Sequence, residues 1–356
     1  DSWAAAKRTI QAGVDAAGPG DTVLISNGVY GLTNTIRLAA VHDIELRGLN
    51  DANVVIDGNR AVRCIAAEKH VHLRGLTIRN GKVTGPTGNG GGIVMYGGGR
   101  VSNCRIISNQ AAAGGGVFGY DVVVSNCLVA HNTAQYSGGG LDLVTFKSGT
   151  IAVLDSVVSN NVAADYSNGR AEGGGIRISE DNAAARIVNC RIVNNRADGP
   201  HNSNVGGGLY VNAASALTVR NTLVAGNRAV DNGGGAWVAQ GTVFENCTIA
   251  GNTAEGKGSG LLLRTQAGMA GCRVENSVIF SNFSSDSGSW RDDVYLIANA
   301  PNAFENVWVG NRSNDPPLRG TTIVYRSDPR FQAGARDGWR LSRVSPCINA
   351  GTNRPW

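Results

Sequence analysis

The sequence has little of what membrane-spanning and helical proteins contain. Of its 356 residues only two are methionine, and 17% are charged. No apolar segment approaches the roughly 20 residues that a transmembrane helix needs. The chain starts at Asp1 without a signal peptide, so we expect any export signal to have been removed. The abundance of Asn, Ser, Thr and Val favours an all-β chain.

The charges and the cysteines exclude two further classes of site. The formal net charge of +5 comes from scattered arginines without a basic run, so it does not indicate a nucleic-acid partner. It favours, weakly, an acidic partner such as a uronate-containing or sulfated glycan. The seven cysteines are odd in number and lack the paired spacing of a disulfide framework or a zinc site.

What the sequence does contain is a repeat. Its first motif has the form (Asn/Asp)-(Cys/Ser/Thr)-x-(Ile/Val)-x-x-Asn. Seven copies occupy residues 103–109, 126–132, 155–161, 189–195, 221–227, 246–252 and 276–282. Their spacing varies from 23 to 34 residues, which is typical of a solenoid whose fixed unit carries a loop of variable length.

A second motif, a Gly-Gly-Gly or Gly-Ser-Gly triplet and an apolar stretch, alternates with the first. Its copies occupy residues 90–96, 114–120, 138–144, 173–179, 206–212, 233–239 and 258–264. Glycine permits a positive φ and a close approach between coils. The residues that follow alternate as in a strand, and we expect these to face inward: Ile93, Val117, Leu141, Ile176, Leu209, Ala236 and Leu261.

The asparagines and cysteines of the first motif have mechanical explanations. Asparagine tolerates the left-handed conformation of a sharp turn, and its amide can pair with the asparagine of the next coil. Cysteine shares its position with serine and threonine, which indicates a packing site for a small side chain. We therefore expect Cys104, Cys127, Cys190 and Cys247 to be buried and unreactive.

The repeat predicts one domain over residues 1–356. Residues 1–30 would form an N-terminal cap and first strand, 31–312 the coils, and 313–356 an irregular C-terminal cap. Residues 3–17 have the pattern of an amphipathic helix, which would cover the open apolar end of the solenoid. Short strands are expected at 22–25, 44–46, 54–56 and 71–73.

Several segments resemble the pectin-lyase-like superfamily of right-handed parallel β-helices. IQAGVDAAGPGDTVLISNGVY at 10–30 is similar to its N-terminal segment, and IELRGLN at 44–50 and LRGLTIRNG at 73–81 to its first coils. The repeats resemble those of secreted bacterial β-helix proteins and of polymorphic outer-membrane proteins, and residues 327–351 resemble segments that precede surface anchors. The resemblance implies an all-β, right-handed parallel β-helix (a solenoid). It also implies a secreted protein that is extracellular or at the cell surface, with the periplasm as the alternative. The superfamily contains polysaccharide lyases, glycosidases, epimerases and adhesins, and no catalytic motif of one family is intact here.

A functional surface is expected on the strand after each triplet. The second residue after the triplet should point outward, which aligns Val94, Phe118, Asp142, Arg177, Tyr210, Trp237 and Leu262. Coils lie about 4.8 Å apart, so one sugar would span roughly one coil. We predict a glycan groove here, with substrate-binding residues Phe118, Tyr120, Trp237, Asn212, Arg170 and Arg264. Alternatively, the aromatic side chains pack beneath loops and Asp142–Arg177 is an ordinary salt bridge.

Two reactions are compatible with this surface. β-Elimination on a uronate needs a cation at the carboxylate, a base for the C5 proton and an acid for the leaving oxygen. Arg177 is suited to the first task, and Tyr210, His201 or Lys147 could serve the others. Arg177→Ala is then expected to abolish activity at a nearly unchanged melting temperature.

Hydrolysis would instead require two carboxylates across the glycosidic bond, for which Asp142 with Glu172 or Glu180 is available. The positive net charge of the chain favours the lyase reaction. The long loops 164–172 and 197–205 are expected to wall the middle of the groove.

The predicted partner is an acidic polysaccharide or oligosaccharide, bound by a monomer. No metal-ligand set stands out; calcium is conceivable only at the doublet Asp292-Asp293, where two surface acids are the simpler interpretation. A third hypothesis is a non-catalytic adhesin or glycan-binding surface protein.

Overall fold

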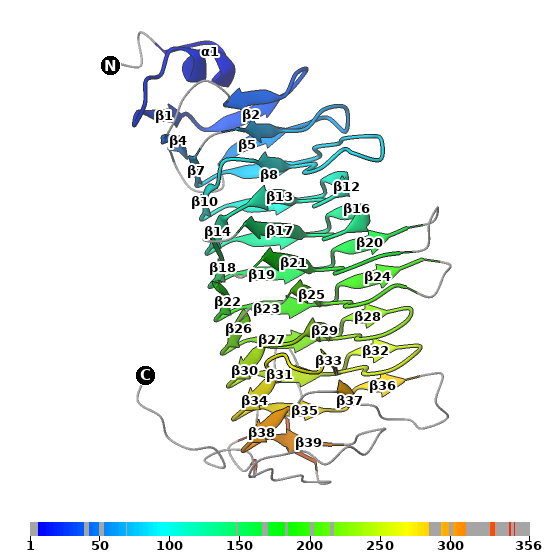
Figure 1. The fold of residues 1–356 in the computed structure, drawn as a ribbon. Helices are drawn as coiled ribbons and strands as arrows, with labels where there is room; N and C mark the ends of the chain where they lie inside the picture. The colour runs from blue at the N-terminus through cyan, green and yellow to red at the C-terminus, as the bar shows by residue number, and fades with distance from the viewer. Residues whose placement is uncertain are drawn as a thin grey trace.

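The computed structural model is a tall parallel β-helix in which the chain coils about one axis (Figure 1). It describes residues 6–38, 43–49, 53–68, 70–146, 149–165, 170–181, 184–199, 203–213, 217–284, 293–298, 302–310, 328–331, 342 and 345. Every strand pair in these ranges is parallel, and the strands of successive coils form four sheets, which we call A, B, C and D.

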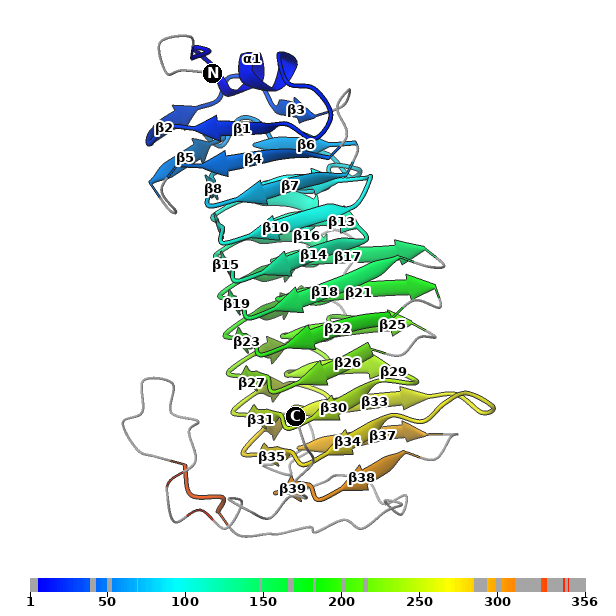
Figure 2. The ribbon, with the colours of Figure 1, turned by 90° about the vertical axis from the view of Figure 1, so that its left-hand side faces the viewer.

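Sheets A and B run the length of the described coils, and Figure 2 shows sheet A facing the viewer. Sheet A consists of β1 (Thr22–Ile25), β4 (Ile44–Gly48), β7 (Val71–Arg74), β10 (Gly99–Ser102), β14 (Val122–Ser125), β18 (Thr150–Leu154), β22 (Ala184–Val188), β26 (Leu217–Arg220), β30 (Val243–Glu245), β34 (Arg273–Glu275) and β38 (Ala303–Glu305). Sheet B consists of β2 (Gly28–Gly31), β5 (Val54–Asp57), β8 (Thr77–Arg79), β11 (Arg105–Ile107), β15 (Leu128–Ala130), β19 (Val157–Ser159), β23 (Arg191–Val193), β27 (Leu223–Ala225), β31 (Thr248–Ala250), β35 (Val278–Phe280) and β39 (Trp308–Val309).

From the coil of β12 to the coil of β32, a Gly-Gly-Gly or Gly-Ser-Gly triplet joins sheet D to sheet C. Sheet C consists of β3 (Ile36–Leu38), β6 (Ile65–Ala67), β9 (Ile93–Met95), β13 (Val117–Tyr120), β17 (Leu141–Phe146), β21 (Ile176–Asp181), β25 (Leu209–Ala213), β29 (Ala236–Ala239), β33 (Leu261–Thr265) and β37 (Val294–Ala298). Sheet D begins only later, with β12 (Gln110–Ala113), β16 (Thr133–Ser137), β20 (Val162–Ala164), β24 (Arg196–Asp198), β28 (Arg228–Ala229), β32 (Thr253–Ala254) and β36 (Phe283–Ser284). The sequence did not predict this fourth sheet.

The core runs through the middle of the coils. All seven residues predicted to face inward after the triplets are fully buried and belong to one continuous apolar cluster. The triplet makes the sharp bend that precedes each of these strands. Gly114 has φ +60°, and a Cβ on Gly115 would lie 2.4 Å from the carbonyl oxygen of Gly139 on the next coil. Only glycine fits both positions.

The two asparagine positions of the first motif perform different tasks. The first residue of each copy has a left-handed φ between +48° and +56°, as predicted, and sits at the corner between sheets A and B. The last residue of each copy is buried, and its side chain forms a ladder of amides along the coils. Asn195, for example, donates from Nδ2 to Asn227 Oδ1 at 3.0 Å and to the carbonyl oxygen of Val158 at 3.0 Å.

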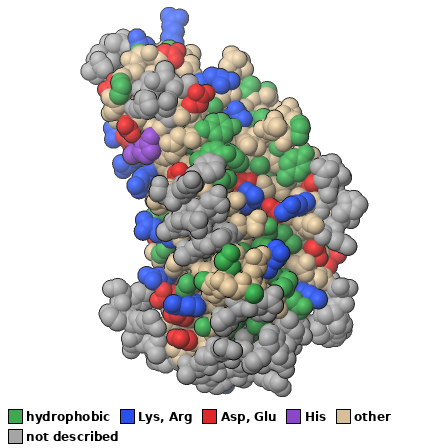
Figure 3. Space-filling model, viewed as in Figure 1, with side chains coloured by type: hydrophobic (Ala, Val, Ile, Leu, Met, Phe, Trp, Pro, Cys, Tyr) green, Lys and Arg blue, Asp and Glu red, His purple; other side chains and the backbone are tan. Residues whose placement is uncertain are grey.

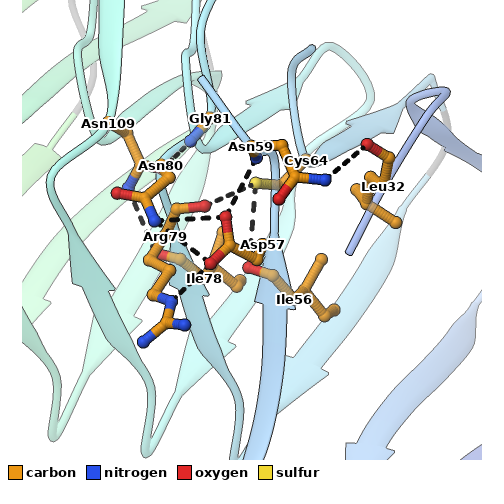
Figure 4. A network of polar contacts seen from close by, with 10 residues as sticks. All are labelled: Leu32, Ile56, Asp57, Asn59, Cys64, Ile78, Arg79, Asn80, Gly81 and Asn109. Carbon is orange, nitrogen blue, oxygen red and sulfur yellow. Dashed lines mark hydrogen bonds and ion pairs between the residues drawn. The ribbon is translucent and has the colours of Figure 1, made fainter. Parts of the chain in front are cut away.

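The ladder is closed by different groups at its two ends. At one end Asn109 Oδ1 accepts from the backbone N–H of Gly81 (Figure 4). Next to it the buried Asp57 accepts from Arg79 Nε at 2.7 Å and from Asn80 Nδ2 at 3.1 Å. At the other end Asp293 takes the place of an asparagine, and its Oδ1 accepts from Asn282 Nδ2 at 2.7 Å.

The cysteines are part of the packing, as predicted. Six free thiols are buried among the described residues, at Cys64, Cys104, Cys127, Cys190, Cys247 and Cys272. In the repeat position each thiol donates to the carbonyl oxygen two residues earlier, as Cys104 Sγ does to Ser102 at 3.1 Å. Ser156 makes the same bond to Leu154 at 2.6 Å. This shared bond explains why the position accepts only small side chains with a donor.

The N-terminal helix is shorter than predicted. α1 spans Ile10–Asp15, after Thr9, whose hydroxyl accepts from the N–H of Ala12. Ile10 and Val14 are buried on the core, so the helix caps the solenoid as expected. Residues 1–5 and most of the predicted C-terminal cap at 313–356 lie outside the described residues. No helix in the described part of the chain is long and apolar enough to cross a membrane.

Candidate active site on sheet C

The predicted column on sheet C exists in the predicted register. Val94, Phe118, Asp142, Arg177, Tyr210, Trp237 and Leu262 are direct partners from coil to coil. Their side chains point away from the main core and form separate small clusters on the outer side of the sheet. The repeat therefore predicted correctly which residues align and on which side of sheet C they lie.

We call this column, from Val94 to Leu262, the inner column. The prediction that its side chains face water is wrong for most of them. Phe118 is 7% exposed, Asp142 1%, Tyr210 3% and Trp237 8%. The side chain of Arg177 is 20% exposed. The column therefore forms a buried floor, and direct contact with a substrate along its length is not available.

The floor is covered by the chain segment that enters each triplet. The residue five positions before each column residue belongs to a ladder formed by Asn89, Ala113, Ser137, Glu172, Val205 and Asn232. Because the triplet reverses the chain, this ladder lies over the column: Ser137 Oγ donates to Asp142 Oδ2 at 2.5 Å. Ala113 packs on Phe118, and Val205 packs on Tyr210.

Two arginines and two carboxylates meet in the middle of the floor. Arg177 donates from Nη1 to Asp142 Oδ1 at 2.9 Å and from Nε to Glu172 Oε2 at 3.1 Å. Arg170 donates from Nε to Glu172 Oε1 at 2.6 Å, and its side chain is 62% exposed. The structure thus brings together four predicted site residues, but the guanidinium of Arg177 is already neutralised by two acids.

Tyr210 lies next to this charge cluster. Burial raises the pKa of its phenol to about 12; Glu172 adds to the rise and Arg170 opposes it. The ring stacks on Trp237 with centroids 4.8 Å apart, and Arg264 lies 5.8 Å above the Trp237 ring. The phenol therefore remains protonated at neutral pH and is placed between the charge cluster and an aromatic stack.

A second column, two residues further along each strand, carries most of the exposed side chains of this face, although Ala239 within it is buried. We call it the outer stripe; it comprises Tyr96, Tyr120, Val144, Ser179, Asn212, Ala239, Arg264 and Ile297. Tyr96, Asn212, Arg264 and Ile297 are exposed, and Tyr120 is half-buried. Figure 3 shows hydrophobic side chains on the upper half of this face and basic and acidic side chains close together below them. Of the predicted substrate-binding residues, Tyr120, Asn212, Arg170 and Arg264 are thus accessible, whereas Phe118 and Trp237 are floor.

Some predicted residues lie outside the described residues. His201 and Lys147 belong to this group, as do the side chain of Glu180 and the whole of Asp292. Asp293 is fully buried and engaged by the Asn282 amide, which explains one member of the acidic doublet without calcium. Within the described ranges, no three His, Cys, Asp or Glu side chains are grouped so that they could hold a metal ion.

Sequence comparison agrees with the fold. A family model for the right handed beta helix region matches residues 18–238, which is more than half of the chain. The chain therefore belongs to this family, and the predicted right-handed parallel β-helix is confirmed. No curated protein matches the sequence.

Solved structures with the same fold are distant in sequence. The structure of pectate lyase Pel9A matches with a TM-score of 0.53 at 16% identity, over 97% of this chain and 86% of that one. Alginate lyase AlyF-OU02 matches with a TM-score of 0.42 at 12% identity, over 94% and 88% of the two chains. The A-module of the Azotobacter vinelandii mannuronan C-5 epimerase AlgE6 matches with 0.37 at 15%, over 88% and 92%. The match to pectate lyase Pel9A shows that the two chains share a fold.

Proposed function

We propose that this protein binds an acidic, uronate-containing polysaccharide along the outer stripe and cleaves it by β-elimination. The observation that carries the proposal is that Tyr120, Asn212 and Arg264 stand in one line beside an inner column with an aromatic stack; Asn212 and Arg264 are exposed and Tyr120 is half-buried. Aromatic rings pack against the apolar faces of sugars, and amides and guanidinium groups bind hydroxyls and carboxylates. At about 4.8 Å per coil, Tyr120 and Asn212 lie three coils or roughly 14 Å apart, and Asn212 and Arg264 lie two coils or roughly 10 Å apart, so one chain of several sugars would contact all three.

The cation in this proposal differs from the one expected from the sequence. Arg177 is paired with Asp142 and Glu172, so it holds the floor together. Arg264 lies over Trp237 and has no carboxylate partner among the described residues. We therefore assign the binding of substrate carboxylates to Arg264 and to the exposed part of Arg170.

The acid and the base are assigned by access to the outer stripe. Tyr210 is 3% exposed, so its protonated phenol, whose pKa is raised to about 12, belongs to the floor and does not reach the leaving oxygen. We therefore assign the base that removes the C5 proton and the acid at the leaving oxygen to His201 and Lys147, which precede β25 and follow β17 in sequence. The carbon–oxygen bond at C4 breaks as the C4–C5 double bond forms.

Hydrolysis is less favoured by the same contacts. A glycosidase needs one carboxyl group that donates a proton and a second that attacks the sugar or activates water. Asp142 accepts from Arg177 on one oxygen and from Ser137 on the other, and Glu172 accepts from two arginines. Neither carboxylate is left for the second role.

Incubation with a panel of pectate, alginate, glycosaminoglycans and neutral glycans tests the proposal. An acidic substrate should give rising ultraviolet absorbance from the unsaturated uronate at the new chain end. Lys147→Ala or His201→Ala should abolish that signal, and Arg105→Ala, an exposed arginine on sheet B, serves as the control. New reducing ends without absorbance would show hydrolysis and contradict the proposal.

A second candidate, a glycan-binding surface protein without catalysis, is favoured by one observation. The two carboxylates of the charge cluster are buried and are balanced by two arginines, as in a purely structural network. Retained binding without turnover of any acidic glycan would select this function. Secretion and the monomeric state stay predictions.

A further inference from the structure

We propose a separate anionic-sugar subsite at the N-terminal end of sheet C, formed by Arg37, Arg63 and Tyr96 around Ala66. The inference extends the proposed function, because the same acidic chain would continue into this subsite. It also stands on contacts of its own, which lie outside the charge cluster near Tyr210.

The inner column begins with an exposed arginine at this end of the molecule. Arg37 pairs with Ala66, and Ala66 pairs with Val94, so Arg37 and Ala66 are the first members of the inner column. The ladder that covers the later members begins at Asn89, five positions before Val94. Arg37 is exposed, whereas the small side chain of Ala66 is 7% exposed.

Arg63 borders this position with a half-buried positive charge. Its guanidinium donates to the carbonyl oxygens of Asn89, at 2.8 Å, and Gly90, at 3.0 Å. No carboxylate within the described ranges forms an ion pair with it. Burial lowers the pKa of Arg63, Tyr96 opposes this and Arg37 adds to it. The two arginines therefore repel one another at this end of the sheet, and a bound anion would relieve the repulsion.

Tyr96 supplies an aromatic surface on the other side. It is 48% exposed and contacts Phe118 and Tyr120, with ring centroids 6.3 and 6.0 Å away. The Phe118 and Tyr120 rings meet edge to face at 5.6 Å, so the exposed ring of Tyr96 has rigid support. Glu68, which precedes Tyr96 in this column, is exposed and forms no ion pair with Arg63 in the described part of the chain.

This combination of groups selects an anionic sugar residue. Tyr96 offers a surface for the apolar face of the ring, and the two guanidinium groups offer donors for one carboxylate or sulfate. A neutral sugar would use the ring but leave both cations unpaired. The subsite continues the outer stripe toward the N-terminus, so a chain that also reaches Arg264 must be long.

Binding of oligogalacturonate and oligoalginate octasaccharides, measured by calorimetry, tests the subsite on the full chain. Arg63→Gln and Tyr96→Ala should each weaken binding about five- to tenfold, while Arg63→Lys and Tyr96→Phe retain most of it. Carboxyl-reduced octasaccharides should show no difference between wild type and Arg63→Gln. Arg105→Gln on sheet B is the matched control, and melting temperatures establish that each variant is folded.

The outcomes separate this inference from the proposed function. If Arg63→Gln and Tyr96→Ala bind acidic octasaccharides as wild type does, while Arg264→Gln is weakened, the subsite is refuted and the proposed stripe stands. If only Arg63→Gln and Tyr96→Ala are weakened, the subsite stands and the proposed binding at Arg264 is refuted. Equal loss in Arg105→Gln would show non-specific charge attraction and overturn the inference.

Discussion

Arg177 donates to Asp142 at 2.9 Å across adjacent coils of sheet C, and Asp142 is 1% exposed. Burial of Arg177 opposes its protonation, but Asp142 and Glu172 raise its pKa beyond its ordinary value. This pair is part of the scaffold beneath the outer stripe. A change at Arg177 should therefore act on stability, contrary to what the sequence predicted for Arg177→Ala.

Arg177→Met should lower the free energy of unfolding by about 3 kcal/mol, because it leaves the Asp142 carboxylate buried without its cation. The double variant Arg177→Met/Asp142→Leu should regain most of the loss. The matched control is Arg228→Met, which breaks an exposed pair with Glu255 and should change stability by less than about 1 kcal/mol. Urea unfolding measures all three. An unchanged stability in Arg177→Met would contradict the structural role of the pair.

Asn195→Ala should be among the most destabilising changes of a single side chain in the repeat. Its Oδ1 accepts from the N–H and Nδ2 of Asn161, and its Nδ2 donates to Val158 and Asn227. Removal leaves buried polar groups unsatisfied, at a loss of roughly 3 kcal/mol. Asn212→Ala, an exposed asparagine on sheet C, should change the melting temperature little. An equal loss of stability in the two variants would show that the asparagine ladder does not stabilise the fold.

The repeat predicted the register because the positions that set it are the most restricted in the sequence. A left-handed turn at Asn126 and a close approach at Gly115 each admit few residue types, so these residues mark the coil boundaries. Inward positions such as Val117 follow from them by alternation. The sequence therefore predicts which residues align.

The burial of the inner column could not be predicted in the same way. It depends on the angle by which the triplet folds sheet D against sheet C, which alternation does not specify. A signal existed in the alanine column of Ala134, Ala163, Ala197 and Ala229, which are all buried. Small residues at one position of every coil indicate a strand packed closely from both sides. This alanine column would have predicted that Ser137 and Glu172 lie over Asp142 and Arg177.

The phenol of Tyr210 should ionise at a higher pH than that of an ordinary tyrosine. Its pKa is raised from 10.0 to about 12 in the folded protein, so the protonated phenol is favoured by folding. The stabilisation is complete below pH 10 and is lost as the pH rises from 10 through 12. Ultraviolet titration of wild type against Tyr210→Phe isolates this phenol. A midpoint at pH 10 in the difference between the two titrations would show that the pKa of Tyr210 is not raised.

The six described thiols should be unreactive in the folded protein. Burial raises the pKa of Cys64, Cys247 and Cys272 to about 12 and that of Cys190 to about 11. Thiolates of these four are therefore scarce at pH 8, as is that of Cys104, whose pKa is also raised by burial. A hydrogen bond with Cys104 lowers the pKa of Cys127, but Cys127 is 4% exposed, so access to it is blocked. In a Cys347→Ser background, a disulfide reagent should label less than one thiol per molecule in buffer and all of them in guanidinium chloride. Rapid native labelling would mean that the coils open near the thiols.

A crystal structure with an acidic octasaccharide is the most direct measurement of where this β-helix binds its ligand. Sugar density should follow the outer stripe from Tyr120 past Asn212 to Arg264, with a carboxylate at the Arg264 guanidinium and the Arg177–Asp142 pair undisturbed. Density on the exposed arginines of sheet A, such as Arg74 and Arg100, with an empty sheet C would contradict it.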